Sequence, residues 1–185
     1  MSSRIFVISS PSGAGKGTVI DRMLELRPEL VYSVSATTRK PRAGEIEGVS
    51  YYFVTREKFL EMIENGEFLE YAEYVGEFYG TPAKPIFESI KDGKDIILEI
   101  DVQGAEQVMA AVPCVTSIFI TPPDWDELER RLRKRGTDTE EKLVARMERA
   151  RIECMEKDHY AYTIINDDVN RAAEEILSII DSTVC

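Results

Sequence analysis

The stretch Phe6-Val-Ile-Ser-Ser-Pro-Ser-Gly-Ala-Gly-Lys-Gly-Thr18 decides which fold the sequence predicts. An apolar run, Ile5 to Ile8, indicates a buried strand, a small glycine-containing turn follows, and a helical pattern begins at Lys16. A strand, a glycine-rich turn and a helix in this order are the context that a phosphate-binding loop requires. The backbone N–H groups of such a turn can wrap a phosphate, and the helix N-terminus faces it with its positive dipole end. Lys16 adds a point charge for the β- and γ-phosphates.

The loop departs at two positions from the usual pattern G-x-x-x-x-G-K-[ST]. Ser10 stands where the first glycine would be, and Gly17 stands where the pattern has a hydroxyl that ligates Mg²⁺, with Thr18 one residue later. An ordinary glycine-rich turn is the alternative interpretation. The strand before the turn, the helix after it and the lysine favour the phosphate-binding loop.

Length and composition indicate one globular domain. The chain has 185 residues, 43% of them apolar and 31% charged, which is enough for one sizeable core and a small inserted lobe. No apolar run approaches the ~20 residues needed to span a bilayer, and the N-terminus lacks the apolar region of a signal peptide. We therefore expect a cytoplasmic protein without a membrane partner.

The cysteines and the histidine exclude several kinds of site. Cys114, Cys154 and Cys185 are an odd number at wide spacing, which fits neither a metal pattern nor a disulfide framework, so reduced thiols are expected. His159 is the only histidine, which argues against a histidine base or a histidine-based zinc site. The sequence assigns no role to these four residues.

The charge pattern points to small anionic ligands. The net charge of −11 argues against a nucleic-acid surface. Basic residues nevertheless gather at Arg39-Lys-Pro-Arg42 and between Arg130 and Arg151. Two positive patches on an acidic protein favour a polyanionic ligand in a focused cleft, although solvated surfaces are the ordinary explanation of charge runs.

The order of the elements predicts an α/β fold with a parallel sheet and helices on both faces. Strands are expected at 5–8, 31–36, 51–54, 95–101, 115–120 and 162–165, and helices at 16–26, 55–63, 82–93, 103–111, 124–134, from 137 onward and at 170–180. A hairpin at Gly76-Glu77 makes residues 37–81 a β-rich insertion, with Phe68, Glu70, Ala72 and Tyr74 on one face of its first strand. Ligands of such sheets bind at the carboxyl ends of the strands, which here carry Ser9-Ser10, Ser35, Asp101 and Asn166.

The stretch Gly13-Ala-Gly-Lys-Gly-Thr18 resembles the phosphate-binding loop of nucleoside monophosphate kinases. Several further stretches resemble sequence motifs of the guanylate kinase family. The longest is Thr37-Thr-Arg-Lys-Pro-Arg-Ala-Gly-Glu-Ile-Glu-Gly-Val-Ser-Tyr-Tyr-Phe-Val54, which resembles the family signature. Gly80 after Tyr79, Leu98-Glu-Ile-Asp-Val-Gln-Gly104, Arg135-Gly-Thr and Asn166-Asp-Asp168 also match. The resemblance runs from Ile5 to about Ile180.

The resemblance implies a P-loop NTPase-like domain over residues 1–185 with two appended parts. Its core would comprise residues 1–36 and 82–185, with a GMP-binding insertion at 37–81 and a helical lid at about 131–147. The implied reaction is ATP-dependent phosphorylation of GMP to GDP, with dGMP as a further acceptor. Mg²⁺ would be held mostly by the nucleotide and water, and the resemblance assigns it no direct protein ligand. ATP would be bound by Pro11, Ser12, Gly13, Ala14, Gly15, Lys16, Gly17, Thr18 and Asn166.

The resemblance also assigns residues to the acceptor and to catalysis. Arg39 and Arg42 would clamp the α-phosphate of GMP, with hydrogen bonds from Tyr51 and Tyr79. Glu70 would accept from guanine N1–H and N2–H, which adenine cannot offer together. The remaining GMP contacts would come from Ser35, Thr81 and Asp101. Catalysis would involve Lys16, Arg39, Arg131, Arg135 and Arg146, the last three as lid arginines, with Arg135 also stacking on the adenine.

Two other functions remain compatible with parts of the sequence. A related small-molecule kinase, for example one that phosphorylates a ribose phosphate, would keep the loop but lack Glu70, Ser35 and the Arg39/Arg42 pair. A guanylate-kinase-like scaffold module that binds phosphopeptides would lack an intact loop, whereas Lys16 is present. The expected partners are ATP and GMP, and the sequence is compatible with a monomer or a homo-oligomer.

Overall fold

The computed structural model describes residues 3–74, 76–134 and 140–183, and its main element is a parallel sheet of five strands. The strand order is β2-β7-β1-β8-β9. The strands are β1 (Ile5–Ser9), β2 (Val31–Tyr32), β7 (Ile96–Glu99), β8 (Val115–Thr121) and β9 (Tyr162–Ile165). β1 is central, with Ile5 opposite both Ile96 and Val115, so the phosphate loop that follows it leaves the middle of the sheet.

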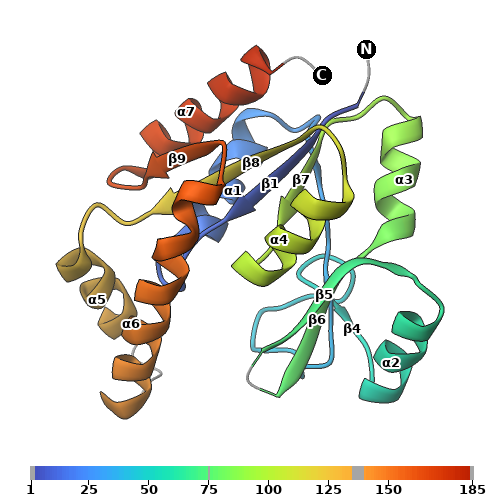
Figure 1. The fold of residues 1–185 in the computed structure, drawn as a ribbon, viewed down its shortest axis with the longest axis horizontal. Helices are drawn as coiled ribbons and strands as arrows, with labels where there is room; N and C mark the ends of the chain where they lie inside the picture. The colour runs from blue at the N-terminus through green and yellow to red at the C-terminus, as the bar shows by residue number, and fades with distance from the viewer. Residues whose placement is uncertain (1–2, 75, 135–139, 184–185) are drawn as a thin grey trace.

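Helices cover both faces of this sheet, as the sequence predicts (Figure 1). On one face, Phe6 and Ile8 of β1 belong to a core with α1 (Lys16–Leu26) and α7 (Val169–Ser182). On the other face, Ile5 and Val7 belong to a core with α3 (Ala83–Lys91) and α4 (Val102–Ala111). The alternation of side chains along β1 therefore divides the apolar core between the two helical layers.

A second, smaller sheet has the strand order β4-β3-β6-β5. Its strands are β3 (Ala36–Thr37), β4 (Tyr52–Phe53), β5 (Phe68–Tyr74) and β6 (Glu77–Pro82), and β5 and β6 form the predicted hairpin. Helix α2 (Arg56–Glu64) packs on it through Phe59, whose ring stacks on Phe68 and Phe78 with centroids 4.4 and 5.3 Å away.

Two details of the predicted strands are wrong. The single strand expected at 31–36 is divided, because β2 pairs in the main sheet whereas β3 pairs in the second sheet. The alternation expected along β5 is interrupted by a register shift between Phe68 and Glu70, since Phe68 lies opposite Pro82 and Glu70 opposite Thr81. A β-bulge of this kind adds a residue to one strand and turns the following side chains. Phe68 therefore packs on Phe59, while Glu70 is buried elsewhere.

Helices α5 (Trp125–Lys134) and α6 (Glu140–Met155) form a separate unit, followed by the 3₁₀ helix η1 (Glu156–His159). They lie at the lower left of Figure 1, whereas the second sheet lies at the lower right. Leu128, Leu132 and Leu143 make a small apolar core between the two helices. At the start of α5, the N–H of Glu127 donates to Asp124, as expected of the predicted capping box. The capping box predicted at 137–140 begins outside the described residues.

Among the helices of the described chain, none is long and apolar enough to cross a membrane.

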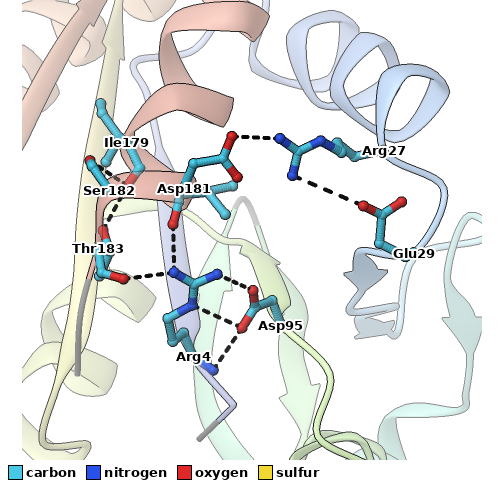
Figure 2. A network of polar contacts seen from close by, with 9 residues as sticks. Arg4, Arg27, Glu29, Asp95, Ile179, Asp181, Ser182 and Thr183 are labelled. Atoms are coloured by element: carbon cyan, nitrogen blue, oxygen red, sulfur yellow. Dashed lines mark hydrogen bonds and ion pairs between the residues drawn. The ribbon is translucent and has the colours of Figure 1, made fainter. Parts of the chain in front are cut away.

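A polar network around Arg4 joins the two ends of the described chain (Figure 2). The Arg4 guanidinium donates to both carboxylate oxygens of Asp95, at 3.1 and 2.5 Å. It also donates to the carbonyl oxygens of Ile180 and Thr183 at the end of α7, at 2.6 and 2.7 Å. The network holds the start of β1, the segment before β7 and the C-terminus of α7 together, at the edge of the sheet away from the phosphate loop.

Candidate active site

A cavity of about 590 Å³ lies between the phosphate loop and the second sheet, at the carboxyl ends of β1 and β7. Most of the site residues predicted from the sequence line it: Pro11, Ser12, Gly13, Gly15, Lys16, Gly17, Thr18, Ser35, Arg42, Tyr51, Glu70, Tyr79, Asp101 and Arg146. Of the other predicted residues that the structure describes, Ala14, Arg39, Thr81, Arg131 and Asn166 lie outside its wall. Arg135 lies outside the described residues.

The phosphate loop requires glycine at two positions. Gly13 and Gly15 have φ values of 94° and 90°, in the left-handed region that other residues rarely adopt. A side chain at Gly15 would also collide with the amide of Asn166. In the described structure no side chain caps the start of α1, and no acidic residue lies in its first turn. The first turn of α1 itself therefore supplies no anion that would compete with a phosphate for the N–H groups at this helix start.

Lys16 lies at the junction between the loop and α1. Its Nζ donates to the carbonyl oxygen of Ile100 at 2.7 Å and lies 4.0 Å from the carboxylate of Glu99. The other Glu99 oxygen accepts from the hydroxyl of Tyr32 at 2.7 Å, and burial together with Glu99 raises the pKa of Tyr32. The lysine is thus held in the cavity wall by a carbonyl oxygen and a carboxylate.

Oxygen ligands suited to a hard cation gather beside the loop. Thr18, Asp21 and Glu99 all line the cavity. Burial raises the pKa of Asp21, and the nearby charge of Glu99 raises it further. A cation beside Asp21 and Glu99 would offset the effect of burial and of the neighbouring negative charge on Asp21, and oxygens are the ligands that Mg²⁺ prefers. Within the described residues no three His, Cys, Asp or Glu side chains converge as a metal-binding group.

Glu70 of β5 lines the cavity on the side of the second sheet and is only 5% exposed. One carboxylate oxygen accepts a hydrogen bond of 2.6 Å from the hydroxyl of Thr81, which is fully buried. Burial raises the pKa of Glu70 to about 7, against the opposing effect of the Thr81 hydrogen bond. Asp101, which also lines the cavity, caps α4 by accepting from the N–H of Gly104 at 2.8 Å. Thr81 therefore orients the carboxylate from behind the cavity wall.

The two arginines of the second sheet lie differently. Arg42 lines the cavity with Tyr51 and Tyr79. Arg39 instead makes a bidentate ion pair with Glu45, at 2.7 and 2.9 Å, and its guanidinium lies 5.4 Å from the ring centre of Tyr51. The N–H of Arg42 also donates to Glu45, at 2.6 Å. The hydrogen bonds from Arg39 lower the pKa of Glu45, so this carboxylate stays charged and connects both arginines.

Two of the three predicted lid arginines, Arg131 and Arg146, contact the phosphate loop. Arg146 of α6 donates to the hydroxyl of Ser12 at 2.9 Å and lines the cavity. Arg131 of α5 donates to the carbonyl oxygens of Ala14 and Asn166, at 3.0 and 2.9 Å, and to Glu127 at 2.6 Å. The amide of Asn166 donates to the carbonyl oxygen of Ala14 at 2.7 Å. Arg131 and Asn166 thus support the loop from its outer side.

Comparison with known proteins gives the family. The family model described as guanylate kinase matches residues 2–183. The chain belongs to the guanylate kinase family. It is 50% identical to a guanylate kinase of Carboxydothermus hydrogenoformans over 95% of this chain and 86% of that protein. It is 47% identical to one of Synechococcus sp., over 96% of this chain and 82% of that protein.

Among solved structures, the guanylate kinase of Anaplasma phagocytophilum is 40% identical and superposes with a TM-score of 0.82. The match covers 98% of this chain and 86% of that chain. The fold is therefore the P-loop NTPase fold of guanylate kinases, and the predicted fold class and family are confirmed.

In this member of the guanylate kinase family, sequence reasoning missed six acidic or phenolic residues of the site: Asp21, Tyr32, Glu45, Tyr74, Glu99 and Glu153. Glu99 carried a usable signal, because it ends a buried apolar strand on the edge where ligands bind. Glu45 stood within the family signature, but only the fold brings it against Arg39. Glu153 accepts from the N–H of Ser12 across 141 residues, a contact that no local pattern reveals.

Proposed function

We propose that this protein transfers the γ-phosphoryl group of ATP to the α-phosphate of GMP, which gives ADP and GDP. One observation carries the proposal: a single cavity is lined both by the phosphate loop with Lys16 and by the buried Glu70 of the second sheet. Membership of the guanylate kinase family supports the same reaction. dGMP is included as an acceptor, because the contacts proposed here are with the base and the phosphate.

ATP would bind with its phosphates on residues 11–18. Phosphoryl transfer depends on positioning and on charge neutralisation more than on covalent help from the protein. Lys16 would exchange its hydrogen bond with Ile100 for the β- and γ-phosphates. Mg²⁺, bound with ATP, would supply neutralising charge on those phosphates. Thr18, Asp21 and Glu99 would hold it, through water or directly, because their oxygens line this part of the cavity.

GMP would bind with its base at Glu70 and its phosphate at the second sheet. The Glu70 carboxylate, oriented by Thr81, would accept from guanine N1–H and N2–H, with Ser35 and Asp101 beside the base. Adenine would place an unprotonated N1 against that carboxylate. A site built on buried polar groups rejects the wrong base strongly, because those groups stay unpaired.

The phosphate of GMP would be held by arginines and tyrosines. Arg42, Tyr51 and Tyr79 already line the cavity, whereas Arg39 would turn from Glu45 toward the phosphate. The planar guanidinium suits phosphate oxygens. Arg146, already bonded to Ser12 of the loop, would stabilise charge on the transferred group. The same role is proposed for Arg131, after exchange of its loop contacts, and for Arg135, which would also stack on the adenine while Asn166 lines the adenine pocket.

The proposal also includes closure of the site over the nucleotides and the compartment in which the protein acts. The insertion at 37–81 and the segment at about 131–147 would close over the nucleotides and exclude water. The protein would act in the cytoplasm on free nucleotides, with neither a membrane nor a nucleic acid as partner.

A coupled assay of ADP release tests the proposal. ATP and Mg²⁺ would be supplied with GMP, dGMP, AMP, CMP, UMP or ribose 5-phosphate. We expect turnover with GMP and dGMP and little with the others. Lys16→Ala should lower kcat by about a hundredfold or more, because Lys16 neutralises charge that develops during transfer. Turnover of the ribose phosphate would favour the related kinase, and failure to bind ATP in calorimetry would favour a phosphopeptide-binding module.

A further inference from the structure

We propose that Gly104 and Gln107 of α4 are positioning residues for guanine recognition, with Gly104 leaving the space that the Glu70 carboxylate occupies. The inference rests on the proposed function, because it concerns the same base-binding end of the cavity. Gly104 and Gln107 are one helical turn apart and act on two successive residues of β5, Glu70 and Tyr71.

The first observation is the close approach of Gly104 to Glu70. A Cβ at position 104 would collide with Oε2 of Glu70 and lie 2.9 Å from its Cδ. Gly104 is buried in the first turn of α4 and has no positive φ, so its backbone conformation is open to any residue. Glycine also weakens a helix relative to alanine. The requirement for glycine here therefore comes from the carboxylate and not from the backbone.

The second observation is a clamp between Gln107 and the main chain of Tyr71. The Gln107 amide donates to the Tyr71 carbonyl oxygen at 2.9 Å, and its oxygen accepts from the Tyr71 N–H at 3.3 Å. β5 is the edge strand of the second sheet, and its bulge lies just before Glu70. The Gln107 side chain thus pairs with the open edge of β5 as a neighbouring strand would.

Together these contacts hold the Glu70 carboxylate in position from two sides. Thr81 of β6 bonds Oε1, and the bare backbone of Gly104 borders Oε2. Asp101, which caps α4 through the N–H of Gly104, lines the same wall. α4 packs on the main sheet, so it fixes the base-reading group of the second sheet relative to the core that carries the phosphate loop.

A side chain at position 104 would collide with two atoms of Glu70, Oε2 and Cδ. They are the terminal atoms of one flexible side chain, so the carboxylate can move while the backbone stays in place. Such a movement takes Oε2 away from the guanine edge and strains the bond to Thr81. Gly104→Ala should therefore weaken guanine recognition and leave the fold intact.

The experiment compares Gly104→Ala with Gln103→Ala, an exposed neighbour on α4. We expect Gly104→Ala to raise KM for GMP about tenfold and to narrow the GMP:AMP ratio of kcat/KM by a similar factor, with KM for ATP and Tm nearly unchanged. Gln107→Ala should act in the same direction by about threefold, and the exposed Glu106→Gln should not. Unfolding of Gly104→Ala, or an unchanged GMP:AMP ratio, would contradict the inference.

A double-mutant cycle with Glu70→Gln tests whether Gly104 acts through Glu70. In the Glu70→Gln background, Gly104→Ala should change the GMP:AMP ratio by less than about twofold, because the contact partner is already altered. Equal effects in both backgrounds would assign Gly104 a general structural role instead.

A second readout does not depend on activity. The ¹³C resonance of the Glu70 carboxylate in the ligand-free protein should shift in Gly104→Ala and stay in place in Gln103→Ala. An unmoved resonance would overturn the inference whatever the acceptor. Absence of GMP turnover by the wild-type protein, with the resonance shifted as expected, would overturn the proposed function and leave the contact between Gly104 and Glu70 supported.

Discussion

The hydroxyl of Thr81 lies 2.6 Å from a carboxylate oxygen of Glu70, in a site where Glu70 is only 5% exposed. One hydrogen bond does not replace the water that a carboxylate loses on burial, so the pKa of Glu70 rises to about 7. Asp101 raises it and Lys16 lowers it, as the charged groups that face Glu70. Near neutral pH, the ligand-free protein is therefore divided between an acceptor-only carboxylate and a carboxyl group that can donate.

The first prediction is that KM for GMP rises as the pH falls below 7. Guanine needs the charged carboxylate as a double acceptor, whereas a protonated carboxyl offers one donor and one acceptor, which suits adenine N1 and its amino group. KM for GMP should approach a rise of about tenfold per pH unit, and the GMP:AMP ratio should narrow. Initial rates from pH 5.5 to 8.5 measure both.

The reference for this profile is Glu70→Gln. The phosphate of GMP itself titrates near pH 6, by analogy with a phosphorylated side chain, and both proteins report that titration. Only the wild-type profile should contain the additional rise that begins near pH 7. Profiles of the same shape in both proteins would show that Glu70 does not read the base.

The second prediction concerns stability against pH. The folded pKa of Glu70 is raised, so the folded state binds more protons than the unfolded state between about pH 4.5 and 7. Stability is then highest below that window and is lost as the pH rises through 7. Relative to Glu70→Gln, the wild-type protein should lose up to about 3 kcal/mol between pH 5 and pH 8. Urea unfolding of the two proteins measures this difference, in which the other titrating groups cancel, and a constant difference would contradict the prediction.

The third prediction separates stability from activity at the Arg4 network. Arg4→Ala removes the partner of Asp95 and of two carbonyl oxygens at the end of α7, in a partly buried site. Charged hydrogen bonds of this kind suggest a loss of about 2 kcal/mol in the free energy of unfolding. Kinetic constants for ATP and GMP should stay the same, because no residue of the network that Figure 2 shows lines the cavity.

A matched control for Arg4 is Arg22→Ala, which removes an arginine paired with Glu25 on the exposed surface of α1. Exposed pairs contribute about 1 kcal/mol or less. Urea titrations measure the stability of both variants. An equal loss of stability in Arg4→Ala and Arg22→Ala would show that the Arg4 network does not hold the chain ends together.

Much of the fold could be predicted because local physics and tertiary structure agree there. The apolar run 5–8, the glycine turn and the helix from Lys16 are each specified by neighbouring residues, and β1 and α1 follow them. The predicted helices and the β5–β6 hairpin are likewise specified by neighbouring residues. Most of the predicted site residues then meet in one cavity, because parallel strands bring their carboxyl ends to one edge.

The sequence failed where long-range contacts override local pattern. The segment 31–36 reads as one strand, yet its halves pair with different sheets. The bulge in β5 reverses an alternation that the side chains alone suggest. The contact of Ser12 with Glu153 depends on the relative placement of a loop and a helix that are far apart in the sequence. The pair of Arg39 with Glu45 is local, but it depends on the conformation of an irregular loop, which no short pattern specifies.

The fourth prediction concerns Glu45, which forms a bidentate pair with Arg39 and accepts from the N–H of Arg42. In the absence of GMP, this carboxylate could either compete with the phosphate for Arg39 or hold the loop in place for it. Its second bond, to the main chain of Arg42, favours the second role, because competition for a guanidinium needs no contact with the backbone. We expect Glu45→Gln to raise KM for GMP by about fivefold to tenfold and to change kcat less, since the loop is ordered before transfer.

The control for Glu45 is Glu61→Gln on α2, which removes the same charge from the exposed surface of the inserted lobe. A charge effect alone would change KM for GMP equally in both variants, whereas loop positioning predicts an effect in Glu45→Gln only. Calorimetry with GMP in the absence of ATP adds a direct test of binding. Tighter binding of GMP by Glu45→Gln would show that Glu45 competes with the phosphate, because loss of a competitor frees Arg39 while loss of a positioning contact cannot increase affinity.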